Sequence, residues 1–385
     1  MENIPYHSWL EIHADHLQHN LRVLQTLAHK EARIMAVVKA FCYGHGLEIA
    51  KLLYSFGLRD FGVSSVEEGC ELKKVGVRGN IYILGGFLPW EAEVVVQEEF
   101  IPIVSSRRDL ESLRSAAKKL AKRVFFHLKI DTGMGRLGFL PSEFPPSILE
   151  EYLGDSLVQM GGVLTHFSSA ESDAEYTRGQ FALFREFLER HRLSSKNLVY
   201  HCCNSAAFLQ FPEMHLHMSR VGIALLGVSP TIHSKLTRES GLEPVAQLKT
   251  RIKYIKCLPS AFRVGYGGTF TTSRETQVAI VALGYAQGVF RNLSNKMEVL
   301  VRGKRARVIG NISMDQLAID VTEIQEAQEG DVVTIIGEDG AERIEAEELA
   351  RLANTIPHEI LCSLKKVPHR VVLYERDRVA TRELC

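Results

Sequence analysis

The chain has 385 residues, more than a typical single domain, so two domains are expected. Hydrophobic residues make up 45% and charged residues 24% of the chain, which is usual for a globular enzyme. Lysine plus arginine number 46, as do aspartate plus glutamate, so net charge gives no reason to expect nucleic acid or an anionic membrane as a partner.

The ends and the cysteines of the sequence bear on localisation. Residues 1–8 lack a basic segment followed by an apolar stretch, so a secretory signal is not expected. The apolar runs are too short for a membrane span. Seven cysteines, an odd number without framework spacing, indicate reduced thiols. Together these features predict a cytoplasmic protein.

From about residue 14 to residue 230, helical and strand-like patterns alternate. Helices are expected at residues 15–29, 49–56, 66–75, 110–120 and 178–190. Eight strands are expected at residues 34–39, 60–64, 81–84, 101–104, 124–130, 161–166, 198–201 and 221–226. This order predicts a closed parallel (β/α)8 barrel, similar to the TIM barrel, over residues 10–238. An open doubly wound sheet is the alternative, but the first strand is not followed by the glycine pattern of a dinucleotide site.

After about residue 235, helical patterns nearly vanish and short strand-like runs separated by turn signals take over. Strands are expected at residues 277–283, 298–301, 306–309, 317–321, 332–335 and 370–374, with one helix near residues 346–353. The sequence therefore predicts a second, mainly β domain over residues 239–385, with residues 1–9 packing against it.

Lys39 ends the first apolar, β-branched run and precedes a turn that contains glycine. A lysine that extends from a strand end to water is the simplest interpretation. Near a buried strand end, however, the pKa of the amine can fall, and a neutral amine is a nucleophile that forms Schiff bases. The rest of the chain favours this second interpretation.

Functional groups of a parallel barrel lie at the carboxyl ends of its strands. Polar residues are found at several such positions: Lys39 after strand one, residues 131–138 after strand five, His166 at the end of strand six, Asn204 and Ser205 after strand seven, and residues 220–223 at the start of strand eight. One polar residue at a strand end is a weak signal. Several of them around one lysine predict an active site.

These stretches are similar to those of the alanine racemases, pyridoxal 5′-phosphate (PLP) enzymes built from a barrel and a β domain. The resemblance covers nearly the whole chain. It rests on residues 36–40, 43–46, 129–138, 204–205, 220–223, 264–268, 284–286 and 313–315, and on His166.

The resemblance implies two catalytic bases. Lys39 binds PLP through a Schiff base and later exchanges a proton with one face of the substrate Cα. Tyr266, supplied by the partner subunit of a homodimer, is the base on the opposite face, because stereoinversion needs proton exchange on both faces. A hydrogen-bonded chain through His166 to Arg220 helps the phenol to ionise. Arg220 meets the pyridine nitrogen, and since guanidinium keeps its proton, racemisation is favoured over transamination.

The resemblance also implies how the cofactor and the substrate are held. Phosphate contacts are expected from the hydroxyls of Tyr43 and Ser205 and from the backbone N–H groups of Gly222 and Ile223, with Asn204 and His358 also beside the cofactor. Arg136 approaches the phenolic oxygen and the substrate carboxylate, and Lys129 either carries a carbamate that positions Arg136 or remains an ordinary lysine. Met314 and Asp315 of the partner bind substrate at the entrance. No metal site is expected.

Four positions depart from the family pattern. Phe41 replaces asparagine or aspartate, Gln287 replaces aspartate, and Ser313 replaces cysteine. His358 stands in the place of a tyrosine that contacts the phosphate and narrows the substrate entrance. Imidazole still donates a hydrogen bond, but it is shorter and titrates near neutral pH, so pocket size and pH response are expected to change.

The sequence thus predicts a cytoplasmic, homodimeric alanine racemase that makes D-alanine for peptidoglycan. A racemase of another small amino acid, such as serine, is one alternative. A PLP-dependent decarboxylase is another, but such enzymes resemble the chain less around Tyr266. A PLP-carrying regulatory protein without turnover is the last, but such barrels usually lack a β domain.

Overall fold

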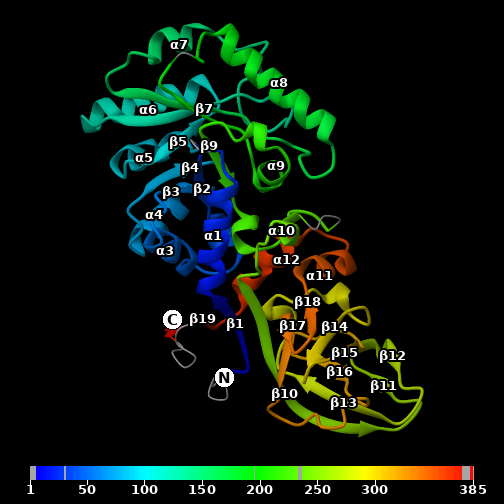
Figure 1. Cartoon of the computed structure of the whole chain (residues 1–385). Coiled ribbons are helices and arrows are strands. Elements are labelled where there is room, and N and C mark those ends of the chain that lie inside the picture. Colours follow the sequence, from blue (N-terminus) through cyan, green and yellow to red (C-terminus); the bar gives the residue numbers. More distant parts are fainter. Residues whose placement is uncertain (1–5, 30–31, 195, 233–235, 375–381, 385) are drawn as a thin grey trace.

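The computed structural model describes residues 6–29, 32–194, 196–232, 236–374 and 382–384. An α/β barrel, blue to green in Figure 1, is followed by a mainly β unit in yellow to red. Among the described residues, no helix combines the length and the apolar composition needed to cross a lipid bilayer.

The barrel contains eight parallel strands, hydrogen-bonded in the order β8-β7-β6-β5-β4-β3-β2-β9. They are β2 (Arg33–Val37), β3 (Asp60–Val63), β4 (Asn80–Ile83), β5 (Ile101–Val104), β6 (Val124–Lys129), β7 (Val158–Leu164), β8 (Val199–His201) and β9 (Met218–Val221). The two strands at the ends of this order, β8 and β9, contact each other, so the barrel is nearly closed. The predicted barrel is confirmed, and the open doubly wound sheet is wrong.

The helices that alternate with these strands are α1 (Ala14–Leu27), α3 (Glu48–Ser55), α4 (Val66–Lys74), α5 (Ala92–Gln97), α6 (Arg107–Leu120), α7 (Ser147–Tyr152), α8 (Ala174–Arg190) and α9 (Ser205–Gln210). Each long helix buries one apolar stripe; in α1 the stripe includes Leu17, Leu21 and Leu24. The short helix α10 (Leu236–Glu239) leads into the second unit.

The second unit is a ten-stranded sheet in the order β18-β17-β14-β15-β16-β13-β10-β1-β19-β20. Its strands are β1 (Ser8–His13), β10 (Ala246–Leu258), β13 (Thr276–Val281), β14 (Glu298–Val301), β15 (Lys304–Ile309), β16 (Leu317–Asp320), β17 (Val332–Asp339), β18 (Glu342–Ile344), β19 (Arg370–Leu373) and β20 (Arg382–Leu384). A hairpin of β11 (Arg263–Val264) and β12 (Phe270–Thr271) stands apart. The mainly β character predicted for this part of the chain is confirmed.

The last predicted barrel strand, at residues 221–226, is wrong. Strand β9 ends at Val221, and residues 223–226 form the 3₁₀ helix η3 (Ile223–Leu226). Gly222 has φ −118° and ψ −87°, which takes the chain out of the extended conformation. A short buried apolar run does not reveal by periodicity whether it is a strand or a helix, because all its faces are covered.

A second helix in the β unit, α12 (Pro357–Ser363), was not predicted and is important for the site. It follows α11 (Ala346–Ala353), which matches the predicted helix, and packs against α2 (Lys39–Tyr43) in the barrel. Arg370 strengthens this junction by donating hydrogen bonds to the carbonyls of Gly44 and His45, both at 3.0 Å. The β unit therefore contributes side chains to the carboxyl end of β2.

A buried ion pair joins the amino-terminal strand to the sheet. The Nζ atom of Lys249 in β10 lies 2.8 Å from a carboxylate oxygen of Glu11 in β1, and both side chains are almost completely buried. We expect Lys249→Met to lower the free energy of unfolding by about 3 kcal/mol, because it leaves a buried carboxylate without its ammonium. Urea denaturation followed by circular dichroism measures this.

The control is Lys119→Met, which breaks the exposed pair between Lys119 and Glu93 at 2.6 Å. Exposed pairs contribute at most about 1 kcal/mol. Equal urea midpoints for the two variants would show that burial of the Lys249 pair has no energetic importance.

Candidate active site

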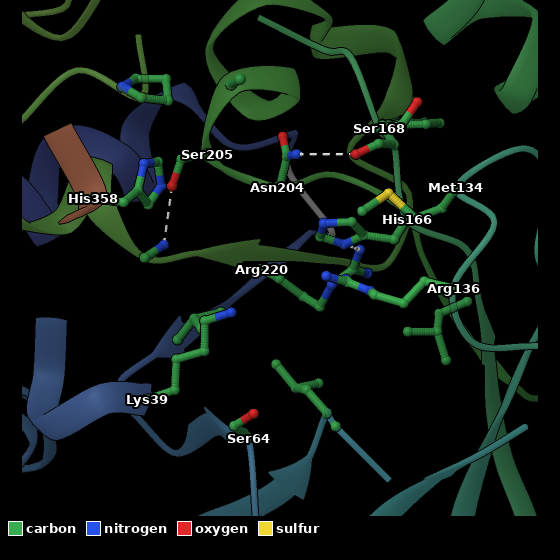
Figure 2. Close-up of a pocket in the computed structure, with 18 of the residues that line it drawn as sticks. Lys39, Ser64, Met134, Arg136, His166, Ser168, Asn204, Ser205, Arg220 and His358 are labelled. Atoms are coloured by element: carbon green, nitrogen blue, oxygen red, sulfur yellow. Dashed lines mark hydrogen bonds between the residues drawn. The ribbon is translucent and has the colours of Figure 1, made fainter. Parts of the chain in front are cut away.

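A cavity of about 420 Å³ opens at the carboxyl ends of the barrel strands. Figure 2 shows Lys39, His166 and Arg220 pointing into it, with His358 of α12 at one side. The predicted residues that line it are Lys39, Tyr43, Lys129, Arg136, His166, Asn204, Ser205, Arg220, Gly222 and His358. Residues spread over more than 300 positions of the sequence are thus brought to one site.

Lys39 enters the cavity from an unusual backbone conformation. The four residues after it, 40–43, have φ values of 51° to 58°, which place a run of non-glycine residues in the left-handed region. This conformation costs roughly 1–2 kcal/mol per residue, so the surrounding structure must hold it. Desolvation by neighbouring protein atoms and the charge of Arg136 lower the pKa of Lys39, although its side chain still reaches solvent. A lowered pKa increases the fraction of neutral, nucleophilic amine.

Hydroxyl and N–H groups converge at the start of η3. The Ser205 hydroxyl accepts hydrogen bonds from the backbone N–H groups of Gly222 at 3.0 Å and Ala224 at 3.4 Å. A Cβ atom on Gly222 would lie 2.2 Å from the Tyr43 hydroxyl, so only glycine allows this close approach. The hydroxyls of Ser205 and Tyr43 and the backbone N–H of Ile223 in the same turn form a cradle of donors suited to an anion.

Arg220 in β9 is buried at the floor of the cavity and is held by neutral acceptors. Its guanidinium donates to the carbonyls of Thr165 at 2.9 Å and Cys202 at 2.8 Å, and bonds the ring nitrogens of His201 at 2.9 Å and His166 at 3.1 Å. Burial lowers the pKa of Arg220 to about 10, so the guanidinium remains charged at neutral pH. The sequence placed Arg220 at the start of the last strand; it lies within β9, one residue from its end.

The imidazoles around Arg220 are held neutral. Burial, followed by the charge of Arg220, lowers the pKa of His166 and of His201 well below the usual value. His201 continues the network to Nδ1 of His127 through a 2.8 Å bond. Because these rings stay neutral, each is able to accept a hydrogen bond from the guanidinium at one nitrogen.

The loop after β6 is organised by Asp131. One of its carboxylate oxygens accepts from the backbone N–H groups of residues 133–135, and the other accepts from that of Arg136 at 2.9 Å. Burial acts to raise the pKa of Asp131, but these four N–H donors outweigh it and the pKa is lowered. Lys129, at the end of β6, is buried, and burial together with Arg220 and Arg136 lowers its pKa to about 8.

The remaining predicted residues that line the cavity are Asn204 and His358. The side chain of Asn204 caps α9 by accepting from the N–H of Ala207 at 2.9 Å. His358 is five residues from the end of α12, with its ring centroid 5.9 Å from that of Tyr43. Among the described residues, its Nδ1 is buried without a hydrogen-bond partner. Burial, followed by Lys39, lowers the pKa of His358 to about 4.

Four predicted residues are not among those that line this cavity: Ile223 in η3, and three residues of the β unit. Tyr266 begins the 3₁₀ helix η4 (Tyr266–Gly268), its side chain is 73% exposed, and its carbonyl accepts from Asn311 at 2.8 Å. Met314 and Asp315 are also exposed. Within one chain, therefore, the structure brings together the barrel residues and His358 but not Tyr266, Met314 or Asp315.

Sequence reasoning missed His201, which bonds Arg220, and Glu68 in α4, which accepts from the N–H of Ala40 at 2.7 Å. His201 ended a predicted strand and was therefore at a position that faces the site. The spacing of Ser65 and Glu68 is that of a helix capping box, which identifies a helix start but not a contact with another loop.

The fold and the site define a barrel enzyme with a reactive lysine beside an anion cradle and a buried guanidinium. Family models agree with this: residues 12–230 match "Alanine racemase, N-terminal domain" and residues 245–372 match "Alanine racemase, C-terminal domain". An alanine racemase of Halothermothrix orenii is 38% identical over 367 residues, which are 94% of this chain and 96% of the relative.

Solved structures agree as well. The alanine racemase of Clostridium difficile superposes with a TM-score of 0.90 at 31% identity and covers 99% of both chains. That of Bartonella henselae, solved with covalently bound pyridoxal phosphate, superposes with a TM-score of 0.84 at 29% identity over 96% of this chain and 100% of the other. The chain belongs to the alanine racemase family, an enzyme family of isomerases.

The buried imidazoles predict how stability changes with pH. Burial lowers the pKa of His127 to about 3 and those of His45 and His358 to about 4, whereas an unfolded histidine has a pKa of about 6.5. Below pH 6.5 the unfolded chain therefore binds more protons than the folded one, and stability falls. We expect the free energy of unfolding to decrease between pH 7 and pH 5 by on the order of 1–2 kcal/mol per buried imidazole.

Thermal unfolding at pH 7, 6 and 5 measures this decrease. His127→Gln removes one of the titrating groups, so its melting temperature should fall less steeply over the same pH range, whatever its stability at pH 7. A melting temperature that stays constant down to pH 5 would contradict the assignment of neutral, buried rings.

Proposed function

We propose that this chain is a PLP-dependent alanine racemase that interconverts L-alanine and D-alanine. The observation that carries the proposal is the arrangement around Lys39: an amine of lowered pKa shares one cavity with an anion cradle and a buried guanidinium. Membership of the alanine racemase family supports it.

The residues present fit PLP. Its aldehyde requires an amine, which Lys39 offers, and its phosphate requires donors, which Tyr43, Ser205 and the turn at Gly222 offer. The absence of a Cβ at Gly222 allows the Tyr43 hydroxyl to approach the backbone. We assign Ile223, Asn204 and His358 to the same end of the cofactor and Arg136 to its phenolic oxygen.

When bound, PLP withdraws electrons from the substrate Cα and makes its proton acidic. Lys39 removes or returns the proton on one face. Tyr266 of the partner subunit serves the other face, which requires a homodimer with shared active sites. The exposure of Tyr266 and its absence from the cavity of its own chain support this arrangement.

The hydrogen-bonded network around Arg220 has two expected effects, one on the cofactor ring and one on the Tyr266 phenol. A guanidinium has donors only and keeps its proton, so Arg220 would hold the ring nitrogen of the cofactor without protonating it, which would limit electron withdrawal and favour return of the proton to Cα. The phenol of a free tyrosine has a pKa of about 10, and each unit of depression needs about 1.4 kcal/mol. His166, bonded to Arg220, connects a fixed positive charge to the place where the phenol would bind.

Further residues are assigned to binding of the substrate. We propose that Arg136 binds the substrate carboxylate, that the partner's Met314 donates its backbone N–H to it, and that the partner's Asp315 lines the entrance. The pKa of Lys129, lowered to about 8, increases the fraction of neutral amine, which would add carbon dioxide and release a proton to form a carbamate that positions Arg136.

At the level of the cell, we propose a cytoplasmic enzyme whose D-alanine enters peptidoglycan. At the level of the chain, we propose a division into residues 10–238 and 239–385, with the first nine residues joined to the second part. The pairing of β1 with β10 and β19 supports joining the amino-terminal segment to the second part, and it extends that segment from residue 9 to His13.

A second candidate is racemisation of another small amino acid, such as serine. His358, where the family has a longer tyrosine, favours it because a shorter side chain leaves more room at the entrance. Comparison of kcat/KM for alanine and serine, in the wild type and in His358→Tyr, decides between the two substrates.

Two single substitutions test the two-base assignment. Lys39→Ala should lose the yellow, borohydride-sensitive chromophore, because the amine that condenses with PLP is gone. Tyr266→Phe should keep the chromophore and lose racemisation by at least about 100-fold, the usual contribution of a general base. Absorbance spectra and an assay of L- to D-alanine conversion measure both. Normal racemisation by Tyr266→Phe would refute the assignment.

Mixing the two variants tests the shared site. A dimer of one Lys39→Ala chain and one Tyr266→Phe chain contains one site with both bases intact and one with neither. Activity should therefore appear when the two inactive variants are mixed, approaching about a quarter of the wild-type value if chains exchange at random. Either variant mixed with itself is the control, and no recovery despite proven chain exchange would exclude a site built from two chains.

A further inference from the structure

Glu68 connects the loop that carries Lys39 to the neighbouring barrel unit. Its Oε1 accepts a hydrogen bond from the backbone N–H of Ala40 at 2.7 Å, and its Oε2 accepts from that of Ser64 at 2.7 Å. Ala40 directly follows Lys39 and is the first residue of the left-handed turn. One carboxylate thus holds the end of β3 and the turn after β2 at a fixed separation.

This use of a capping residue differs from the usual one. Ser65 caps α4 by accepting from the N–H of Glu68, and a glutamate at this position normally bonds back to the N–H of the cap itself. Helix α6 shows the usual form: Asp109 accepts from the N–H groups of Ser105 and Ser106 in its own loop. In α4 the carboxylate instead bonds the residue before the cap and the neighbouring loop.

The turn needs such a contact. Four successive non-glycine residues at positive φ are unfavourable without outside support, and each relaxes toward the right-handed or extended regions when released. The bonds within the turn, such as Gly44 N–H to the Ala40 carbonyl at 3.0 Å, do not fix it to the barrel. Glu68 links the turn to the barrel through Ala40, the residue directly after Lys39.

The carboxylate also acts on the lysine through its charge. Desolvation and Arg136 lower the pKa of Lys39, whereas Glu68, followed by Cys362, opposes the decrease. The other titratable groups that interact with Lys39 are Lys129 on β6, His166 after β7 and His358 on α12. Of the groups named here, Glu68 is the one that carries a carboxylate. Replacing Glu68 with a neutral residue should therefore lower the pKa of the Lys39 amine.

We propose that Glu68 is a positioning residue for Lys39, whose carboxylate locks the left-handed turn from which the lysine enters the cavity. This inference rests on the proposed function, because the cofactor must bind at Lys39 for the position of the amine to matter. Without the lock, only a fraction of the molecules present Lys39 correctly, and the apparent affinity for PLP falls by that fraction.

The test compares Glu68→Gln with the wild type and with Asp109→Asn. The glutamine amide presents a donor where the carboxylate had a second acceptor, so one of the two backbone bonds is lost. The matched control removes the equivalent charge from the α6 capping box, outside the Lys39 loop. Titration of the PLP-depleted proteins with PLP, followed by absorbance, gives the dissociation constants.

We expect Glu68→Gln to raise the dissociation constant for PLP by about 10-fold or more, the usual effect of losing a hydrogen bond to a charged group, and Asp109→Asn to change it less than about 2-fold. The second measurement is the pH dependence of the rate at which PLP attaches to the protein. Its midpoint should move to lower pH in Glu68→Gln, a change that mere loosening of the fold does not produce.

Equal dissociation constants and equal pH midpoints for Glu68→Gln and the wild type would overturn the inference. Borohydride reduction of the wild type followed by peptide mass analysis separates this failure from failure of the proposed function. If the wild type carries no cofactor on Lys39, the proposed function and the role of Glu68 both fall. If it does and Glu68→Gln behaves normally, only the role of Glu68 falls.

Discussion

The site depends on one buried positive charge that has no carboxylate among its described hydrogen-bond partners. Arg220 is held by two imidazoles and two backbone carbonyls, all neutral. A carboxylate in their place would neutralise the charge and remove its influence on the cavity. Burial is the largest cause of the lowered pKa values of His166, His201 and Lys129, and the charge of Arg220, which its neutral acceptors leave uncompensated, adds to it in each case.

A second constraint is mechanical. Lys39 must be placed on a turn that its own residues disfavour, and the barrel and the β unit each support that turn. Glu68 in α4 bonds its first residue, while α12 of the β unit packs against the turn. Arg370 adds hydrogen bonds to the carbonyls of Gly44 and His45. The β unit is therefore part of the support for the turn that carries Lys39, and it also carries Tyr266.

The sequence predicted the parts of the molecule that depend on local pattern. Apolar periodicity located seven of the barrel strands, and residue type at strand ends located Lys39, His166 and Arg220. The last strand was misplaced because the buried run around η3 is apolar on every side. The roles of His201 and Glu68 were not visible, since each depends on a contact between loops that only the closed barrel brings together. Such contacts leave no periodic signal in the chain.

His358 shows how a departure from the family pattern can be accommodated. Its Nδ1 is buried without a partner among the described residues, and an unsatisfied buried polar atom costs about 1–3 kcal/mol. The ring is neutral, because burial and Lys39 lower its pKa to about 4, so one nitrogen donates and the other accepts. Under the proposed function, a phosphate beside Tyr43 would offer acceptor oxygens to the ring nitrogen that carries the proton. Under the same proposal, a histidine in place of a tyrosine would keep a hydrogen-bond donor near the phosphate while it shortens the side chain, so it would widen the entrance without removing a phosphate contact.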